Sequence, residues 1–336
     1  MGIKIVRTLP EDIWRNFLAG NPAANVFHTP EMFRVFARTT GYRPALWVAV
    51  DDGRRPLALL APVEIAVLGG PLRRLTSRAV AYGSVLVAPG ADDTEALAPL
   101  LTAYRQDTAG SVLFTELRNL SDTAVWRPAL EEGGFAYEEH LNFLINIARP
   151  PEAIWAGIRS NARRNIQKAQ REGVVVEEAT DPAQVPAAYA ILRGVYRRLQ
   201  VPLADQALFQ AAFDILQPAG LFKIILARVE GKAVGVMTLL LHAGVIIYWY
   251  TGVDKAYSAY RANDLLVWHA LEWGSRNGYH TFDFGGAGKP GEEYGVRDFK
   301  AKFGGELVSY GRYQCVHSPR LLHLSERGYG VLRRFL

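Results

Sequence analysis

The chain has 336 residues, of which 49% are hydrophobic and 21% charged, so it can bury two cores in domains of about 150 residues each. One cysteine, Cys315, excludes a disulfide framework within the chain and a multi-cysteine metal site. The net charge of +5 is small for this length; it permits an anionic partner such as a phosphate-bearing substrate or RNA without requiring one.

The first residues, MGIKIVRTLPEDIW, contain no apolar run of the kind that forms a secretory signal peptide. We therefore expect a protein of the cytoplasm.

One order of elements is predicted twice along the chain. Pro44–Ile65 and Phe222–Gly244 each read as a strand, a short acidic-Gly-basic turn and a second strand. After each hairpin the sequence predicts a further strand, a helix and a last strand, at 83–89, Thr94–Gln106 and 111–117 in the first half and at 245–252, Asn263–Asn277 and 279–284 in the second. This repetition indicates two copies of one α/β unit.

A strand–helix–strand crossover makes the last two strands of each unit parallel, whereas the hairpin is antiparallel. The predicted fold class is therefore α/β with mixed sheets. It resembles the fold of the GCN5-related N-acyltransferases (GNAT), in which the fourth and fifth strands splay apart and an acyl donor binds in the gap. Two such domains in tandem imply a central cleft. Pro150-Pro151 interrupts regular secondary structure, so we expect an acceptor-side domain at 1–149 and a donor-side, catalytic domain at 150–336.

Ala233–Val253 is apolar enough to imitate a membrane span. The sequence His-Ala-Gly at 242–244 interrupts it, and β-branched and aromatic residues fill both halves. Two buried strands joined by a turn fit this pattern better than a helix of about 20 residues.

A basic helix is predicted at Ile158–Glu172, IRSNARRNIQKAQRE. Arg164, Lys168 and Arg171 share one face, which Arg163 extends. Arg163, Arg164 and Lys168 are candidate contacts for phosphate or tRNA; the alternative is an ordinary solvated face.

The segment at 253–273, VDKAYSAYRANDLLVWHALEW, occupies the place of a coenzyme A loop. Such a loop uses glycines to bring backbone N–H groups to a diphosphate at a helix N-terminus. No glycine is present here; the turn holds two tyrosines with Arg261 and Asn263, and Asn263 suits a helix N-cap. The equivalent APGADDTEALAPLL of the first half is acidic. Neither half is therefore built for coenzyme A.

The runs IIYWYTGVD, AYRANDLLVWHALEWGSRNGYHTFDFGG and RDFKAKFGG resemble the Fem family. NVFHTPEMFRVFARTTGY, AYGSVLV and RSNARRNIQKAQREG occur in that family's usual order, so the resemblance covers most of the chain. Fem proteins are aminoacyl-tRNA-dependent transferases that build peptidoglycan side-chain bridges. The resemblance implies an aminoacyltransferase with aminoacyl-tRNA as co-substrate, no cofactor, and a muropeptide or other small peptide as acceptor.

The resemblance also implies roles for individual residues. Lys300 would face the reacting carbonyl and stabilise the oxyanion, with Lys302, on the opposite face if FKAKFGG is a strand, as the alternative. The remaining candidates contact substrate: Arg198 with Arg197 for a diphosphate, Tyr82 and Tyr250 in the cleft, Arg261 and Asn263 at the turn, and Arg38. Arg38 is included because the family's usual lysine is replaced by Phe36, which Arg34 and Arg38 flank; this departure weakens the case for a muropeptide. The long helical hairpin of some family members is also missing.

Two other functions stay open. One is an N-acyltransferase that uses acyl-CoA or an acyl carrier protein in polysaccharide or natural-product assembly. The other is a non-catalytic module that binds RNA or an envelope polymer. Seven scattered histidines show no ligand spacing, so no metal is assigned. The basic C-terminal segment SPRLLHLSERGYGVLRRFL either docks as a helix or touches an anionic membrane surface.

Overall fold

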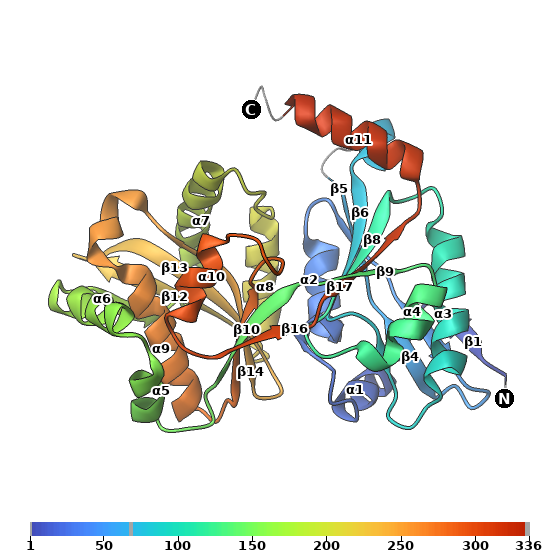
Figure 1. Cartoon of the computed structure of the whole chain (residues 1–336), viewed down its shortest axis with the longest axis horizontal. Helices are drawn as coiled ribbons and strands as arrows, with labels where there is room; N and C mark the ends of the chain where they lie inside the picture. Colours follow the sequence, from blue (N-terminus) through green and yellow to red (C-terminus); the bar gives the residue numbers. More distant parts are fainter. Residues whose placement is uncertain (1, 67–69, 333–336) are drawn as a thin grey trace. The chain divides into compact units, whose positions relative to one another are not determined.

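The computed structural model describes residues 2–66 and 70–332 and divides the chain into two compact units (Figure 1). The first unit contains Met1–Glu139 and Tyr310–Leu336, and the second contains His140–Ser309. This corrects the expected boundaries of 1–149 and 150–336. The physical reason is strand pairing: the strand that follows residue 139 joins the second unit's sheet, and a strand near the C-terminus returns to the first unit's sheet.

The first unit holds an antiparallel sheet, ordered β1-β3-β4-β7, and a mixed sheet, ordered β2-β5-β6-β8-β17-β9. Its elements are β1 (Lys4–Val6), α1 (Glu11–Ala19), η1 (Val26–His28), α2 (Pro30–Arg38), β2 (Tyr42–Pro44), β3 (Trp47–Val50), β4 (Pro56–Leu60), β5 (Val63–Ala66), η2 (Gly70–Leu75), β6 (Ser77–Tyr82), β7 (Leu86–Val87), α3 (Asp93–Thr108), β8 (Phe114–Arg118), η3 (Ala124–Trp126), α4 (Arg127–Glu132), β9 (Ala136–Glu138), β17 (Arg312–Val316) and α11 (Pro319–Leu332). β6 and β8 pair in parallel on either side of α3. The parallel partner of β8 is therefore β6 and not the strand predicted at 83–89, because β7 within that range pairs antiparallel with β4 in the other sheet.

The second unit holds one sheet, ordered β11-β12-β13-β14-β15-β10-β16. Its elements are β10 (Leu141–Asn146), α5 (Pro151–Gly157), α6 (Ser160–Arg171), β11 (Val175–Glu178), η4 (Pro182–Gln184), α7 (Val185–Leu199), α8 (Gln206–Leu216), β12 (Phe222–Val229), β13 (Lys232–His242), β14 (Val245–Val253), η5 (Lys255–Tyr260), α9 (Ala262–Arg276), β15 (Thr281–Gly286), α10 (Gly295–Ala301) and β16 (Glu306–Ser309). The predicted hairpin in place of a membrane span is confirmed by β13 and β14, which pair antiparallel.

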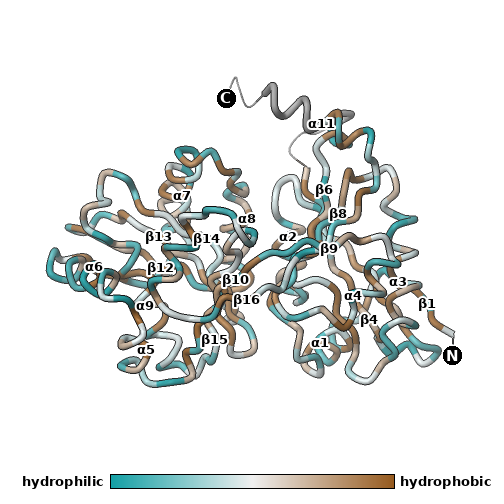
Figure 2. Tube along the Cα trace, viewed as in Figure 1, coloured by the Kyte–Doolittle hydropathy of each residue, from teal (hydrophilic) through white to brown (hydrophobic). Residues whose placement is uncertain are grey.

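Helices cover both faces of the second unit's sheet. Residues of α6 and α9 share one apolar core with alternate residues of β13 and β14, among them Met237, Leu239 and Ile246. On the opposite face α7 packs on β14, where a Cβ added to Gly252 would lie 3.0 Å from Val195. The outer surface of α6 is largely hydrophilic (Figure 2), as its basic sequence predicts.

Over the described part of the chain, none of the helices has the length and apolarity needed to cross a bilayer. The C-terminal helix α11 forms as expected, and its Ser325 hydroxyl donates to the Leu75 carbonyl at 2.7 Å within the first unit. Arg333 and Arg334, which carry part of the expected membrane contact, lie outside the described residues.

Candidate active site

The neighbouring parallel strands β14 and β15 separate part of the way along β14. Their ladder ends at Ile247↔Asp283, whereas β14 continues to Val253. The separation coincides with a bulge, because the register against β13 skips Trp249. A bulge places two consecutive residues on one face and bends the strand; accordingly Trp249 and Tyr250 both pack on Phe209, with ring centroids 6.1 and 4.9 Å away.

A cavity of about 440 Å³ lies beside this free length of β14, and all its described lining residues belong to the second unit. Its walls come from the end of α7, the outer half of β14, the segment from η5 into α9, and α10. The lining side chains combine apolar groups such as Leu199, Val296 and Phe299 with hydroxyl and charged groups. Such a mixture suits a ligand that has a neutral body and an anionic part.

Three exposed cations border the cavity: Arg198 at the end of α7, Lys255 in η5, and Arg261 just before α9. Arg261 has a positive φ of 58°, an uncommon conformation for a residue other than glycine. It precedes the first turn of α9, whose N–H groups carry partial positive charge. Sequence analysis predicted Arg198 and Arg261 as binding residues, and the structure brings both to one cavity together with Asn263.

A buried carboxylate, Asp264, also lines the cavity in the first turn of α9. It is 6% exposed and accepts a hydrogen bond from Asn165 Nδ2 at 3.2 Å. Burial raises the pKa of Asp264, whereas the Asn165 amide and the charges of Lys302 and Arg261 oppose that rise. Sequence reasoning missed Asp264, because an acidic residue in a first helical turn is common and gives no sign of a cavity.

Tyr248 lines the cavity where β14 leaves β15. Burial raises the pKa of its phenol above the ordinary value, and a hydrogen bond with the Thr251 side chain only partly opposes this. Burial likewise raises the pKa of Tyr196 on α7 to about 12. The Tyr248 phenol is therefore a neutral hydrogen-bond donor at ordinary pH.

Lys300 lies on α10, so FKAKFGG does not form the strand that would place Lys300 and Lys302 on opposite faces. The glycine-rich loop before it lets residues 295–301 form a helical turn instead. The side chain is 5% exposed, and its Nζ donates to the carbonyls of Phe284, Gly285 and Gly286 at 2.6, 3.3 and 2.8 Å. An ammonium has three N–H donors. In this arrangement none is left for the oxyanion role that the sequence predicted.

Lys300 instead fixes the end of β15. The three carbonyls that it binds belong to the last strand residues, where the chain turns away from β14. Asp283 strengthens this turn by accepting from the Gly285 N–H at 2.6 Å. Burial lowers the pKa of Lys300 to about 8 and raises that of Asp283 to about 6, while each charge favours the other.

The equivalent opening in the first unit is filled by side chains. The Ala88 N–H donates to the Leu57 carbonyl of β4 at 2.7 Å. The Val87 carbonyl belongs to the same peptide group and therefore points to the opposite edge of the strand. There it accepts from Asn21 Nδ2 at 2.7 Å, and His28 Nε2 lies 3.4 Å from the Ser84 carbonyl. We call the space beside the strand that leaves its parallel neighbour the notch. Among the described residues, the notch of the second unit is open, whereas side chains close the notch of the first.

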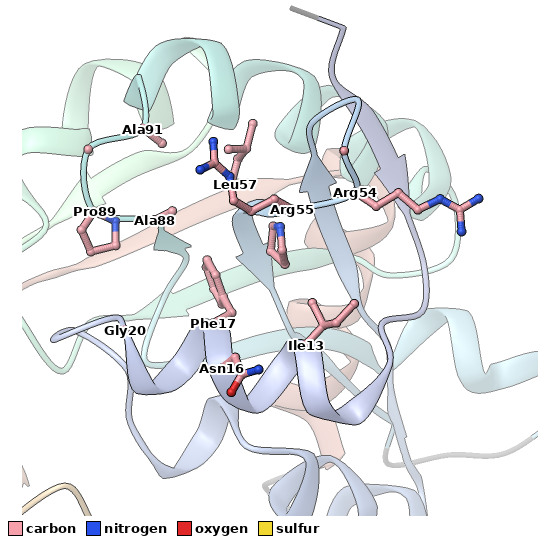
Figure 3. Close-up of a pocket in the computed structure, with 13 residues that line it drawn as sticks. Ile13, Asn16, Phe17, Gly20, Arg54, Arg55, Leu57, Ala88, Pro89 and Ala91 are labelled. Atoms are coloured by element: carbon pink, nitrogen blue, oxygen red, sulfur yellow. The ribbon is translucent and has the colours of Figure 1, made fainter.

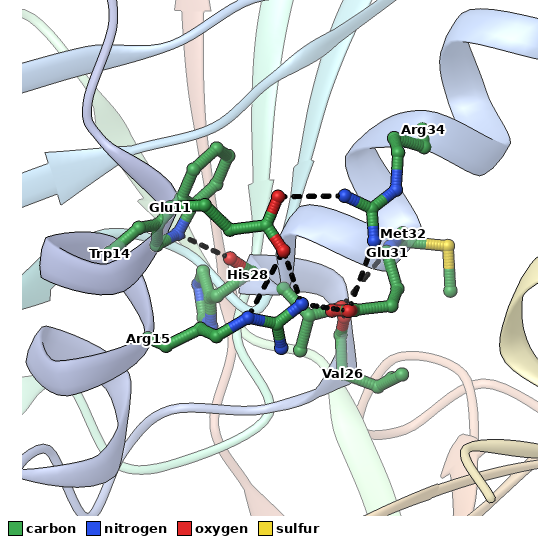
Figure 4. Close-up of polar contacts among 9 residues, drawn as sticks. Glu11, Trp14, Arg15, Val26, His28, Glu31, Met32 and Arg34 are labelled. Atoms are coloured by element: carbon green, nitrogen blue, oxygen red, sulfur yellow. Dashed lines mark hydrogen bonds and ion pairs between the residues drawn. The ribbon is translucent and has the colours of Figure 1, made fainter. Parts of the chain in front are cut away.

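A network between α1 and α2 holds the segment that closes the first unit's notch (Figure 4). Trp14 Nε1 donates to the His28 carbonyl at 2.8 Å. Arg15 pairs with both Glu11 and Glu31, and Arg34 bonds Glu11 at 2.9 Å. These contacts keep His28, which is 1% exposed, in place.

A second cavity of about 540 Å³ lies in the first unit, between α1, the β3–β4 turn and residues 88–91. Figure 3 shows Phe17 rising from α1 toward that loop while Arg54 points away. Arg55, which also lines it, is paired with Asp51 at 3.2 Å. None of its described lining residues is an acid, a histidine, a cysteine or a serine, so we do not place the reaction here.

The other predicted residues lie elsewhere. Arg197 is exposed in the last turn of α7, and Tyr250 packs on Phe209 on the face away from α9. Tyr82 and Arg38 belong to the first unit, where Tyr82 stacks on Phe27 at 4.9 Å. Further site residues that sequence reasoning missed are Lys255, Ser258, Tyr248 and Asn165.

The basic helix α6 forms as predicted, with Ala162, Ile166 and Ala169 buried against the second unit's core. Arg164 is exposed, whereas Arg163 and Lys168 are half-buried. Lys168 lies 3.5 Å from Glu172, an exposed pair that contributes little stability and leaves the helix basic.

Within residues 2–66 and 70–332, no three His, Cys, Asp or Glu side chains form a cluster that could hold a metal ion.

A unit in which a bulged strand leaves its parallel neighbour beside the start of a helix defines the GNAT fold. Residues 156–301 match a family model described as an acetyltransferase (GNAT) domain. This match supports the acyltransferase class that the sequence predicts. No curated protein matches the chain.

Solved structures resemble the whole chain. FemX superposes with a TM-score of 0.72 at 14% identity, covering 96% of this chain and 99% of FemX. L-PGS from Bacillus licheniformis gives 0.59 at 15% identity, over 95% and 97%. A tandem GNAT protein from the clavulanic acid biosynthesis pathway gives 0.59 at 12%, over 95% and 99%. The predicted tandem GNAT fold of Fem type is thereby confirmed; at these identities the likeness concerns the fold.

Proposed function

We propose that the protein transfers an aminoacyl group from aminoacyl-tRNA to an amine of a cell-wall precursor or related small peptide. The observation that carries this proposal is the open notch of the second unit, whose helix α9 begins with Arg261, Asn263 and Asp264 where a coenzyme-A enzyme has glycines. The likeness of the whole fold to FemX supports it.

The proposed step is an aminolysis of an ester. The acceptor nitrogen attacks the ester carbonyl, so that a C–N bond forms and the C–O bond to the terminal ribose of the tRNA breaks. The amine loses a proton, and the ribose oxygen gains one as it leaves. No oxidant or reductant is required, because the ester is already activated.

Tyr248 is the group of this chain best suited to assist that step. Its phenol stays protonated because burial raises its pKa, and it lines the cavity where the strands part. To stabilise the oxyanion that forms at the carbonyl, the phenol would turn its single O–H from Thr251 to that oxygen. Lys300 acts by holding the end of β15 in place.

The cations at the cavity and on α6 suit the donor's phosphodiester backbone. Arg198, Lys255 and Arg261 border the cavity, and Arg164 projects from α6. Each phosphate that a cation neutralises releases a counterion, so affinity for tRNA falls with salt. Arg163 and Lys168 are retained as further candidate contacts.

A second candidate is transfer from an acyl-CoA, which the description of the matched family favours. Isothermal titration of the purified chain separates the two donors. We expect charged tRNA to bind, with affinity that falls as salt rises, and labelled amino acid to appear on a peptide acceptor. Tight binding of acetyl-CoA with no binding of charged tRNA would overturn the proposal. Uncharged tRNA and hydrolysed acetyl-CoA serve as controls.

A further inference from the structure

We propose that Asp264 sets donor specificity by excluding a diphosphate from the cavity at the start of α9. The inference rests on the proposed function, since it concerns the same cavity. It names the residue that separates donors with a diphosphate, such as coenzyme A, from an aminoacyl ester of RNA.

The position of Asp264 carries the argument. It is the third residue of α9, within the turn whose free N–H groups would otherwise receive an anion. Its side chain lines the cavity, yet only 6% of the residue is exposed. In its ionised form the carboxylate presents a negative charge, poorly screened by water, to any group that enters there.

Neighbouring elements contact this carboxylate and oppose the rise in its pKa that burial causes. Asn165 of α6 donates to it at 3.2 Å, and the positive charges of Lys302 and Arg261 act on it. The start of α6 is joined to the end of α10 by a bond from the Arg159 N–H to the Lys302 carbonyl at 2.8 Å. The Asp264 carboxylate therefore cannot swing away without breaking its hydrogen bond with Asn165.

The two donor classes differ in how their charge is spaced. A diphosphate joins two charged phosphates through one oxygen, so both must meet Asp264 at once. A nucleic-acid strand carries one charge per nucleotide, several Å from the next, and these phosphates can reach the rim cations Arg198, Lys255 and Arg261 while the terminal ribose enters. The cavity thereby attracts the separate phosphates of a nucleic-acid strand and repels the two adjoining phosphates of a diphosphate.

The test compares coenzyme A binding by the wild type, Asp264→Asn and Glu272→Gln. The Asn variant keeps the shape and removes the charge. Glu272 lies on the same helix, paired with Arg276 at 2.8 Å, so its Gln variant removes an equal charge away from the cavity. We expect Asp264→Asn alone to bind coenzyme A at least about tenfold more tightly, while Glu272→Gln binds charged tRNA within about threefold of wild type.

Equal coenzyme A affinity in wild type and Asp264→Asn, or an equal gain in Glu272→Gln, would overturn the assignment. If Asp264→Asn does not fold, as judged by circular dichroism, Asp264→Ser takes its place. The wild type provides an independent measurement, because tight coenzyme A binding by it alone contradicts exclusion. Failure of charged tRNA to bind the wild type would count against the proposed function, while the coenzyme A comparison would still decide the role of Asp264.

Discussion

Replacing Lys300 with methionine tests whether this lysine positions the chain or takes part directly in the reaction. The change keeps most of the side-chain volume and removes the ammonium. The carbonyls of Phe284, Gly285 and Gly286 then lose their donor. An unpaired buried polar group costs about 1–3 kcal/mol, so the loss of the donor to three carbonyls costs roughly 3–9 kcal/mol.

A second effect opposes the first. The pKa of Lys300 is about 8 in the fold and ordinarily 10.5, so holding the charged form in the core costs roughly 3 kcal/mol at about 1.4 kcal/mol per pKa unit. Methionine relieves this cost. At pH 7 we therefore expect Lys300→Met to lower the free energy of unfolding by about 0–6 kcal/mol.

The pH dependence gives a sharper signature. Because the pKa of Lys300 is lower in the folded chain than in the unfolded chain, the unfolded state binds the proton more tightly. Lys300 therefore makes the free energy of unfolding rise with pH between about 8 and 10.5. The methionine variant should lack this rise.

Urea unfolding followed by circular dichroism at pH 7 and pH 10 measures both effects. Lys302→Met is the matched control, since Lys302 is half-buried two residues away, and we expect a change below about 1 kcal/mol. A Lys300→Met protein that is as stable as wild type at both pH values and has lost turnover would refute this reasoning. That result would return Lys300 to the oxyanion role predicted from the sequence.

Three further results are expected. Arg261→Ala should reduce the slope of log affinity for charged tRNA against log salt by about 1, measured by titration at several salt concentrations, whereas Arg276→Ala at the far end of α9 should leave it unchanged. Tyr248→Phe should lower turnover at least about tenfold with little change in donor affinity. Because the pKa of Tyr248 is raised, ionisation of its phenol should not lower the wild-type rate up to pH 10. A fall in the wild-type rate at alkaline pH that Tyr248→Phe abolishes would contradict this. Asn21→Leu should lower the free energy of unfolding by about 1–3 kcal/mol because the Val87 carbonyl loses its donor, and an unchanged urea midpoint would speak against the filled notch.

The repeated order of elements was predictable because it depends on local patterns. Acidic-Gly-basic turns between apolar runs specify hairpins, and the helical period at 262–276 specifies the crossover helix. The return of β17 to the first unit was not predictable, because its partner β8 lies about 200 residues earlier in the chain and nothing local selects it. The predicted boundary between the two units differs from the observed one for the same reason.

The site was predictable in its charges and not in its geometry. Arg198 and Arg261 are prominent cations next to helix ends, and both reach the cavity. Lys300 carried the sequence argument, yet the sequence does not reveal that three strand-end carbonyls take all its donors. Asp264 and Tyr248 could be recognised as site residues only from the structure, because the bulge at Trp249 marks where the edge of β14 is free.

The difference between the two units follows from what satisfies a free strand edge. Where a bulged strand leaves its parallel neighbour, its backbone carbonyls need donors, and water, a side chain or a ligand can supply them. In the first unit Asn21 and His28, fixed by the network on α1 and α2, lie there. In the second unit the preceding helix α7 ends at the cavity with Arg198 exposed and leaves room beside β14. One fold thus yields a unit whose free strand edge is covered by side chains and a unit in which a cavity lies beside that edge, and the second is where we propose that a donor binds.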